Sequence, residues 1–386
     1  SKAGDVNGDG YGDVIAGATG IISNTGKAFI YYGGAAMNNI SDVTLNGEAA
    51  SNFFGSSVSD AGDVNGDGYS DVVAGAKGFS GGSGKSYIYL GGAAMNNIAD
   101  VSVTGVIANA NFGYCVSGTG DINGDNFDDV IISSFPPLLG TGKAYVYYGG
   151  SVMNNIADLI LNSNTTFDGF GAAVSGIGDI NADGFKDIAV SAIYNSSSGK
   201  IFIYYGSANP DTTADQFVLG ESGNFGTSVS EAGDVNDDGY ADFISGAPYY
   251  NSSRGRVYLF KYNLTGSDVP DMRLLGEAND NYFGYSVSDA GDVNGDGYPD
   301  FIVGAYRYSS FKGRAYIYFG GPGFDNVADV TLQGEAVTNY FGHDVSGAGD
   351  VNGDGYDDVL VGAFQYNGTK GRAYIYYGGS VMDNIA

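Results

Sequence analysis

The sequence predicts an all-β fold, a seven-bladed β-propeller of four-stranded blades, from three observations. The 386 residues include 66 Gly, 31 Tyr and 22 Phe, a composition typical of many short strands joined by tight turns. A nine-residue acidic motif recurs seven times at a nearly constant spacing, and four strand-like segments can be read in each period. We therefore expect a single β-propeller domain over residues 1–386, with incomplete terminal blades.

The acidic motif organises the whole chain. Its copies begin at residues 5, 63, 121, 179, 234, 292 and 350, so that neighbouring copies are 58 residues apart except for one interval of 55. A fixed period of this length indicates a repeat architecture, in which each unit buries its faces against its neighbours. A linear stack of repeats is an alternative, but seven is a number of units that can close a propeller ring.

The second repeat illustrates the four strands expected in each blade. They are FGSSVS at 54–59, DVVAGA at 71–76, KSYIYLGG at 85–92 and DVSVTG at 100–105, with the acidic motif between the first and the second. In the first repeat the third segment, KAFIYYG at 27–33, is apolar on both faces. A strand of this kind needs packing layers on both sides, and neighbouring blades provide them.

Each acidic motif predicts a calcium site. Positions 1, 5 and 9 are always Asp, position 3 is always Asn, and position 7 is always Tyr or Phe. Calcium takes six to eight oxygen ligands, partly from backbone carbonyls, and a carbonyl is the ligand expected from position 7. About seven Ca²⁺ ions are expected, one for each copy of the motif. The predicted metal ligands are Asp5, Asn7, Asp9, Tyr11, Asp13, Asp63, Asn65, Asp67, Tyr69, Asp71, Asp121, Asn123, Asp125, Phe127, Asp129, Asp179, Asn181, Asp183, Phe185, Asp187, Asp234, Asn236, Asp238, Tyr240, Asp242, Asp292, Asn294, Asp296, Tyr298, Asp300, Asp350, Asn352, Asp354, Tyr356 and Asp358.

Two alternatives to calcium loops of this type are disfavoured. A metal-free turn rich in Asp, Asn and Gly is one, but the Asp side chains at ligand positions would then repel one another without a counter-ion. An EF-hand is the other, but it requires Glu at position 12, where Ala16 and its equivalents stand here, and a strand follows the motif instead of a helix.

Charge and composition exclude several classes of function. The formal net charge is -28, which disfavours binding to nucleic acid. No apolar run approaches the length of about 18 residues that a membrane span requires, so no membrane insertion is expected. The single cysteine, Cys115, and the single histidine, His343, have no catalytic partner visible in the sequence, and paired carboxylates lie in the repeated loops. We therefore expect no enzymatic activity.

A Phe-Gly pair, an acidic loop and an apolar strand that ends in Gly-Ala follow one another in most repeats, as in Phe54-Gly55 and Gly17-Ala18. This arrangement resembles the FG-GAP repeat of integrin α subunits. Only the fifth repeat has the full Gly-Ala-Pro, at 246–248, and the third has Ser133-Ser134 instead. All seven loops qualify as calcium loops, whereas integrins usually have fewer; a compact microbial relative is one interpretation of this difference.

The resemblance implies an extracellular or cell-surface module for adhesion, or for recognition of a protein or a glycan. It places the calcium loops on one face, and ligand binding on the opposite face through the loops that join strands 2 to 3 and 4 to 1. The strand 2 to 3 loops of the last three repeats combine aromatic and basic residues, which are typical anchors of interfaces. The predicted ligand-binding residues are Tyr249, Tyr250, Arg254, Tyr306, Arg307, Tyr308, Phe311, Lys312, Phe364, Tyr366 and Lys370.

The chain has seven acidic loops but only six Phe-Gly pairs. When the repeats are aligned, Ser1 matches Ser117 and Ala386 matches Ala99. We therefore expect the blade of Asp5 to lack its first strand and the blade of Asp350 to lack its fourth. The missing strands would be supplied either by residues that flank this sequence or by a neighbouring copy, since an unpaired strand edge favours pairing with another chain. The alternative function is accordingly a structural subunit of an extracellular filament, in which neighbouring copies complete these blades by strand addition.

Overall fold

The structure, a computed structural model, describes residues 1–136, 141–195, 198–261 and 269–382. The chain divides into two compact units. Unit 1 comprises Ser1–Gly176, Phe185–Asn195 and Phe202–Gln216, and unit 2 comprises Ile177–Gly184, Ser196–Ile201 and Phe217–Ala386. Seven antiparallel sheets, formed in sequence order, account for almost all regular structure of the described residues. The predicted fold class, a seven-bladed β-propeller, is confirmed, whereas a single domain over 1–386 stays a prediction.

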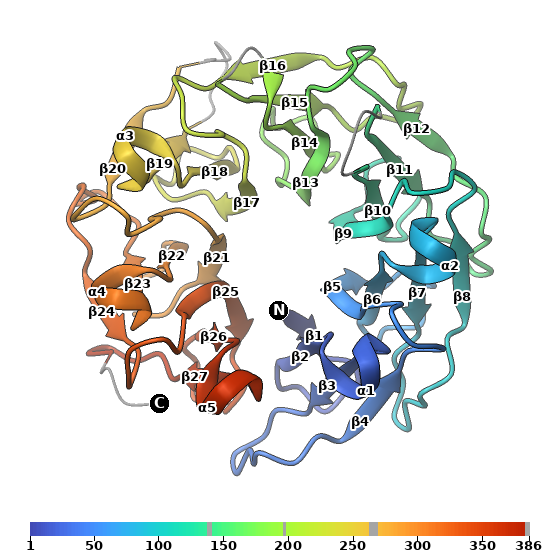
Figure 1. Ribbon diagram of the computed structural model, residues 1–386, viewed down its shortest axis with the longest axis horizontal. Coiled ribbons are helices and arrows are strands. Elements are labelled where there is room, and N and C mark those ends of the chain that lie inside the picture. Colours follow the sequence, from blue (N-terminus) through green and yellow to red (C-terminus); the bar gives the residue numbers. More distant parts are fainter. Residues whose placement is uncertain (137–140, 196–197, 262–268, 383–386) are drawn as a thin grey trace. The chain divides into compact units, whose positions relative to one another are not determined.

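Unit 1 holds the first three sheets and part of the fourth (Figure 1, blue to green). Neighbouring strands in each sheet are neighbours in sequence. Single helical turns α1 (Ile21–Asn24) and α2 (Phe79–Gly82) join the second and third strands of the first two sheets. The strands of the first four sheets, with β15 and β16 shared between the two units, are β1 (Lys2–Gly4), β2 (Asp13–Ala18), β3 (Lys27–Tyr31), β4 (Val43–Asn46), β5 (Phe54–Gly62), β6 (Asp71–Ala76), β7 (Lys85–Tyr89), β8 (Val101–Thr104), β9 (Phe112–Gly120), β10 (Asp129–Ser134), β11 (Lys143–Tyr147), β12 (Leu159–Leu161), β13 (Phe170–Gly176), β14 (Ile188–Ala192), β15 (Lys200–Tyr204) and β16 (Gln216–Leu219).

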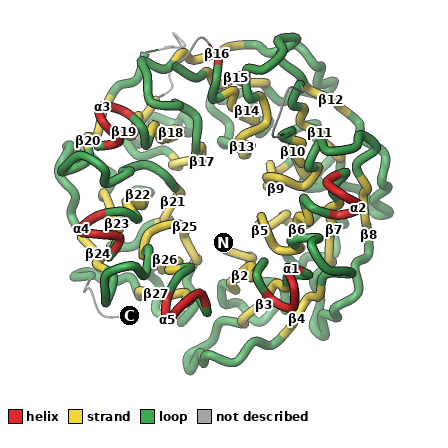
Figure 2. Tube along the Cα trace, in the orientation of Figure 1, coloured by secondary structure: helices red, strands yellow, loops and turns green. Residues whose placement is uncertain are grey.

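Unit 2 holds the last three sheets (Figure 1, yellow-green to red). Here too a helical turn joins the second and third strands of each sheet: α3 (Tyr250–Ser253), α4 (Tyr308–Phe311) and α5 (Tyr366–Thr369), drawn in red in Figure 2. The strands are β17 (Ser228–Gly233), β18 (Asp242–Ala247), β19 (Arg256–Phe260), β20 (Met272–Leu275), β21 (Val287–Gly291), β22 (Asp300–Ala305), β23 (Arg314–Tyr318), β24 (Val330–Gln333), β25 (Phe341–Gly349), β26 (Asp358–Ala363) and β27 (Arg372–Tyr376).

The second repeat shows how closely the strands follow the prediction. The observed strands β5, β6, β7 and β8 overlap the four predicted segments, and β6 coincides with residues 71–76. All residues of β6 are buried, as expected for a strand packed on both faces. In β3 only Ala28 and Ile30 are fully buried, while Phe29 and Tyr31 are half-buried.

The hydrophobic core of each unit lies between adjacent sheets. One cluster in unit 1 joins Ile15 and Ile30 of the first sheet to Phe54, Val72 and Tyr89 of the second. The phenylalanine of each Phe-Gly pair meets an aromatic residue of the third strand of its own sheet edge-to-face, as Phe54 meets Tyr87 with ring centroids 5.3 Å apart. Burial of such rings is the main stabilising contribution between sheets.

The glycine of the Phe-Gly pair is required by a close approach of backbones. Gly55 has φ +77°, and a Cβ atom built on it would lie 2.5 Å from the carbonyl oxygen of Lys27 in the preceding sheet. A side chain there would therefore clash with the backbone of the neighbouring sheet as well as strain its own residue. The pair thus supplies a buried ring and a contact point between two sheets.

The blade of Asp5 was predicted to lack its first strand, and this prediction was wrong, because the last residues of that strand are present and form β1. Lys2 pairs with Val14 and Gly4 pairs with Asp13, so β1 forms a short first strand. The reason is that residues 1–4 match the last residues of the strand that begins at Phe-Gly in other repeats, and these residues suffice to pair with β2. The last sheet has three strands in its described part, β25, β26 and β27.

Candidate functional site

The acidic loops fold around their first aspartate. In the first loop the carboxylate of Asp5 accepts the backbone N–H of Gly8 (2.7 Å), of Asp9 (3.1 Å) and of Gly10 (2.9 Å). The side-chain oxygen of Asn7 accepts the N–H of Asp9 at 2.9 Å. The same bonds recur in the sixth loop around Asp292. These contacts wind the chain so that alternate side chains face the interior of the loop.

The last aspartate of the loop is buried and begins the second strand. Asp300 is fully buried, and its two carboxylate oxygens accept the N–H of Gly320 at 2.8 Å and of Val293 at 2.9 Å. Burial raises the pKa of Asp300 to about 7, the two backbone N–H groups oppose this change, and the nearby carboxylates of Asp296 and Asp292 add to it. The corresponding aspartates of four other loops have their pKa raised to about 7 for the same reasons: Asp13, Asp71, Asp129 and Asp358.

The donor set of these loops fits calcium by its chemistry. Three carboxylates, an amide oxygen and a backbone carbonyl are all hard oxygen ligands, and the first and fifth aspartates are close enough to raise the pKa of the ninth. However, no group of three or more His, Cys, Asp or Glu side chains in the described residues is arranged to hold a metal ion. The carboxylates accept backbone N–H groups instead, so the calcium ligands stay a prediction.

Three of the predicted ligand-binding residues belong to a repeated contact that stabilises the sheets. Tyr250, Tyr308 and Tyr366 each begin a helical turn, and each ring centroid lies 3.7 Å from the guanidinium carbon of the arginine that begins the next strand. Each of these arginines also pairs with a glutamate from the loop that follows the fourth strand of the preceding sheet. We call this arrangement the Glu–Arg clasp; its pairs are Arg256–Glu221 (2.6 Å), Arg314–Glu277 (2.6 Å) and Arg372–Glu335 (2.9 Å).

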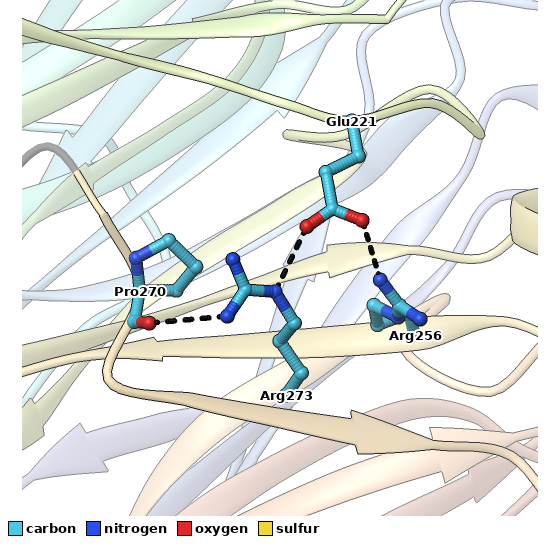
Figure 3. Close-up of polar contacts among 4 residues, drawn as sticks. All are labelled: Glu221, Arg256, Pro270 and Arg273. Carbon is cyan, nitrogen blue, oxygen red and sulfur yellow. Dashed lines mark hydrogen bonds and ion pairs between the residues drawn. The ribbon is translucent and has the colours of Figure 1, made fainter.

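Figure 3 shows the clasp of Glu221, which holds two arginines. One carboxylate oxygen accepts from Arg256 at 2.6 Å and the other accepts from Nε of Arg273 at 2.8 Å. Arg273 also donates to the carbonyl of Pro270 at 3.4 Å. In unit 1 Lys85 takes the place of the arginine opposite Glu48. The clasp recurs, and its arginines are already paired with glutamates. The first role of the three tyrosines that stack on these arginines is therefore to stabilise the fold.

The remaining aromatic residues of the predicted site form a continuous surface in unit 2. Its rings are linked in a chain of contacts with centroids 4.5–5.8 Å apart. Tyr249 is 44 % exposed and Phe364 is 42 % exposed, while the others are half-buried. We call this set the aromatic surface; it consists of Tyr249, Tyr282, Tyr285, Tyr306, Phe311, Tyr340, His343 and Phe364.

Basic residues border the aromatic surface in different ways. The guanidinium of Arg307 lies 4.5 Å from the ring centroids of both Tyr282 and Phe311. Nε of Arg254 donates to the carbonyl of Gly276. Lys312 and Lys370 form no ion pair with any described residue. Of the predicted basic residues, the structure therefore brings only Arg307 into contact with the aromatic surface.

Four members of the aromatic surface were not predicted. Tyr282 and Tyr340 precede Phe-Gly pairs, and Tyr285 and His343 follow them. Tyr282, Tyr285 and Tyr340 come from the loops that join strand 4 to strand 1, and His343 lies near the start of β25. These residues contact the rings of the strand 2 to 3 loops. The signal was present in the sequence: tyrosine precedes Phe-Gly in the last two repeats only, where Phe53, Asn111, Gly169 and Asn224 stand elsewhere.

The two residues considered for catalysis occupy structural positions. Cys115 is half-buried in β9, and burial raises the pKa of its thiol, which makes it a weak nucleophile. His343 lies in β25, where its Nδ1 is 2.8 Å from a carboxylate oxygen of Asp344 and its ring packs 4.5 Å from that of Phe364.

Among the residues that the structure describes, every helix is too short or too polar to span a bilayer.

Comparison with known proteins places this geometry in context. The FG-GAP repeat family model matches residues 54–89, 225–260, 283–318 and 341–376. Integrin alpha-4 of Xenopus laevis is 29 % identical over 269 residues, which cover 66 % of this chain and 25 % of the relative. Integrin alpha-5 of Xenopus laevis is 31 % identical, covering 54 % and 21 %, and integrin alpha-6 of Gallus gallus is 38 % identical, covering 37 % and 14 %.

The chain thus spans a quarter or less of the length of these curated relatives. Each matched repeat covers the first three strands of an observed sheet: the match at 283–318, for example, runs from the Phe-Gly pair to the end of β23. Repeats, sheets and relatives agree: the chain is a β-propeller that contains FG-GAP repeats and is similar in sequence to integrin α subunits.

Proposed function

We propose that this chain is an extracellular calcium-binding recognition module that binds a protein or glycan partner through the aromatic surface. The observation that carries the proposal is the continuity of the eight rings across the last three sheets. Clustered aromatic side chains that remain partly exposed are typical of binding sites. The integrin relatives support a role in adhesion at the cell surface, without enzymatic activity.

Calcium is proposed to act on the fold and not on the partner directly. The Asp, Asn and position-7 carbonyl of each loop would hold one ion, which neutralises carboxylates that otherwise repel one another. Seven ions would contribute about +14 against the formal charge of -28. Calorimetric titration of chelator-treated protein with Ca²⁺ tests this proposal; heats that indicate no binding would contradict it.

The partner-binding proposal is tested with the full chain in calcium on an array of immobilised proteins and glycans. The double variant Tyr306→Ala, Phe364→Ala removes two rings that both contact Tyr340 and His343 and should abolish retention by the partner. Phe217→Ala is the matched control, because Phe217 is 50 % exposed in β16 and lies outside the aromatic surface. If the double variant and Phe217→Ala both bind the partner as the wild type does, the site lies elsewhere on the chain.

A structural subunit of a filament stays the alternative function. In the described part of the last sheet, β27 pairs with β26 on one side and with no described strand on the other. Exposed strand edges can pair with other chains. Light scattering of the purified chain in calcium distinguishes the two functions: particles that grow with protein concentration support strand addition, and a constant monomer mass argues against it.

A further inference from the structure

We propose that Arg307 is the anchor for a carboxylate side chain of an acidic peptide segment in the protein partner. This inference rests on the function proposed for the aromatic surface and adds the chemistry of the partner. The six arginines of the sequence all lie between residues 254 and 372, within unit 2, and their pairing distinguishes Arg307 from the others.

Five of the six arginines have partners that account for their position. Four pair with glutamates at 2.6–2.9 Å, and Arg254 donates to a backbone carbonyl. Arg307 has no carboxylate within ion-pair distance in the described part of the chain. It contacts only two ring faces, at 4.5 Å from Tyr282 and Phe311, and these contacts leave the N–H groups at its edge available to an acceptor from a partner.

Arg307 also departs from the repeat. It precedes helical turn α4, and the residues that precede the other described helical turns are Gly20, Gly78, Tyr249 and Gln365. A cation is therefore not required to form this turn. Since the repeated residues of the loop are explained by packing and by the Glu–Arg clasp, the fold itself gives no reason for an arginine here.

The chemistry of the site selects a carboxylate. A guanidinium that packs against two aromatic rings loses little side-chain entropy on binding and offers two parallel N–H groups to a carboxylate. The chain is strongly acidic, and charge interactions beyond about 8 Å are screened at physiological ionic strength. Recognition of an acidic group at this surface must therefore come from direct contact with a nearby cation, and Arg307 is the cation that contacts the rings.

The packing of the rings favours a peptide over a glycan. Most ring pairs of this surface meet at 50–76°; the exceptions are Tyr306–Tyr340, stacked at 19°, and Phe311–Tyr340, tilted at 35°. The steepest pairs include Tyr249–Tyr282 at 76° and Tyr285–Tyr306 at 67°. Ring faces in these pairs are thus covered by the edge of a neighbour. Sugars stack on flat exposed ring faces, whereas a surface of ring edges suits small apolar side chains that flank an Asp or Glu.

The test uses the full chain in calcium on an array of immobilised hexapeptides, in which one position is Asp, Glu, Asn or Gln and the others are randomised among apolar residues. Wild-type protein should retain the acidic peptides over their amide counterparts. Arg307→Gln should reduce the affinity for these peptides by about 10- to 100-fold, the loss expected for one charge-assisted pair. Arg307→Lys should recover only part of it, because lysine lacks the planar fork.

Lys261→Gln is the control for net charge. Lys261 follows β19 at the end opposite Arg256, and its ammonium lies over Phe324 at 5.2 Å, outside the aromatic surface. This variant should bind as the wild type does, and thermal unfolding of all variants checks that each is folded. An equal loss in the Lys261 variant would attribute the effect to overall charge and overturn the assignment of Arg307.

The remaining outcomes separate this inference from the proposed function. If Tyr306→Ala, Phe364→Ala abolishes partner binding while Arg307→Gln does not, the aromatic surface stands and the role of Arg307 is refuted. If the wild type retains acidic and amide peptides equally, or binds acidic glycans and no peptide, the acidic peptide is refuted. If neither the ring variants nor the Arg307 variants change binding, both the inference and the proposed site fall together.

Discussion

The buried carboxylates of the acidic loops lead to a prediction about stability. In chelator, a rise in pH should lower the free energy of unfolding, and the binding of calcium should raise it. In chelator, the ninth-position aspartates are buried among other carboxylates, and burial raises the pKa of Asp300 and of four equivalents to about 7. Unfolding returns each to its ordinary pKa of about 4. Between these two values the folded chain holds more protons than the unfolded chain, so its stability must fall as the pH rises.

The magnitude follows from one loop. Raising the pKa of Asp300 from about 4 to about 7 makes its ionisation in the folded chain harder by roughly 4 kcal/mol. This penalty is absent below about pH 4 and complete above about pH 7. A bound Ca²⁺ ion favours the ionised carboxylate and removes the penalty, so calcium should displace many protons from the loops at low pH and few at high pH.

Two measurements test this reasoning. Thermal unfolding in chelator should give a lower melting temperature at about pH 8 than at about pH 5.5, and added calcium should raise the melting temperature more at the higher pH. Calorimetry of calcium binding in buffers of different ionisation enthalpy should show more protons released at the lower pH. A chelated protein that is more stable at about pH 8, or calcium binding without any pH-dependent proton release, would refute the reasoning.

Three further predictions concern the scaffold. Phe283→Ala, which removes a buried ring 5.3 Å from that of Tyr316, should lower the free energy of unfolding in urea by about 3–5 kcal/mol, whereas Phe217→Ala should cost far less; equal losses would argue against the packing role of the Phe-Gly ring. Gly297 has φ +91° and open space where a Cβ atom would lie. Gly297→Asn should therefore lose little thermal stability, since Asn126 stands at the same loop position with φ 67°. Gly297→Val should lower the free energy of unfolding by about 1–2 kcal/mol. Glu277→Gln breaks a half-exposed clasp to Arg314 and Tyr316 and should cost about 1 kcal/mol or less, with a smaller effect in high salt; an effect that salt leaves unchanged would show that charge is not its cause.

The fold could be predicted from the sequence because the residues that pack in each sheet recur at the same positions of each repeat. In the second repeat the second strand was predicted at its observed bounds, 71–76, since an aspartate begins it and a buried apolar run follows. The short strand β1 was missed because the expectation required a Phe-Gly pair, although its last residues are enough to pair with β2. Pairing of strands depends on backbone geometry, which a motif at the strand's other end does not determine.

The candidate site was predicted less completely, for a physical reason. The sequence presents the strand 2 to 3 loops as one surface, yet Tyr250, Tyr308 and Tyr366 stack on clasp arginines. These arginines pair with glutamates 35 or 37 residues earlier in the chain, and a contact between sheets leaves no local pattern. Tyr282 and Tyr340 were missed for the same reason. They lie in the strand 4 to 1 loops, and their contacts with the strand 2 to 3 loops join residues that are far apart in the sequence.

Structural and functional residues of this chain can be separated by asking whether the repeat explains them. A residue that recurs in equivalent positions, such as the clasp glutamates or the Phe-Gly ring, is accounted for by a contact that several sheets share. A residue that occurs once must be explained by its own surroundings. Arg307 lacks such an explanation within the described residues, and the tyrosines that precede Phe-Gly, Tyr282 and Tyr340, occur only in the repeat of Arg307 and in the one that follows it. The departures from the repeat therefore concentrate on one surface of unit 2, and this concentration is what directs the binding experiments there instead of to the loops that all repeats share.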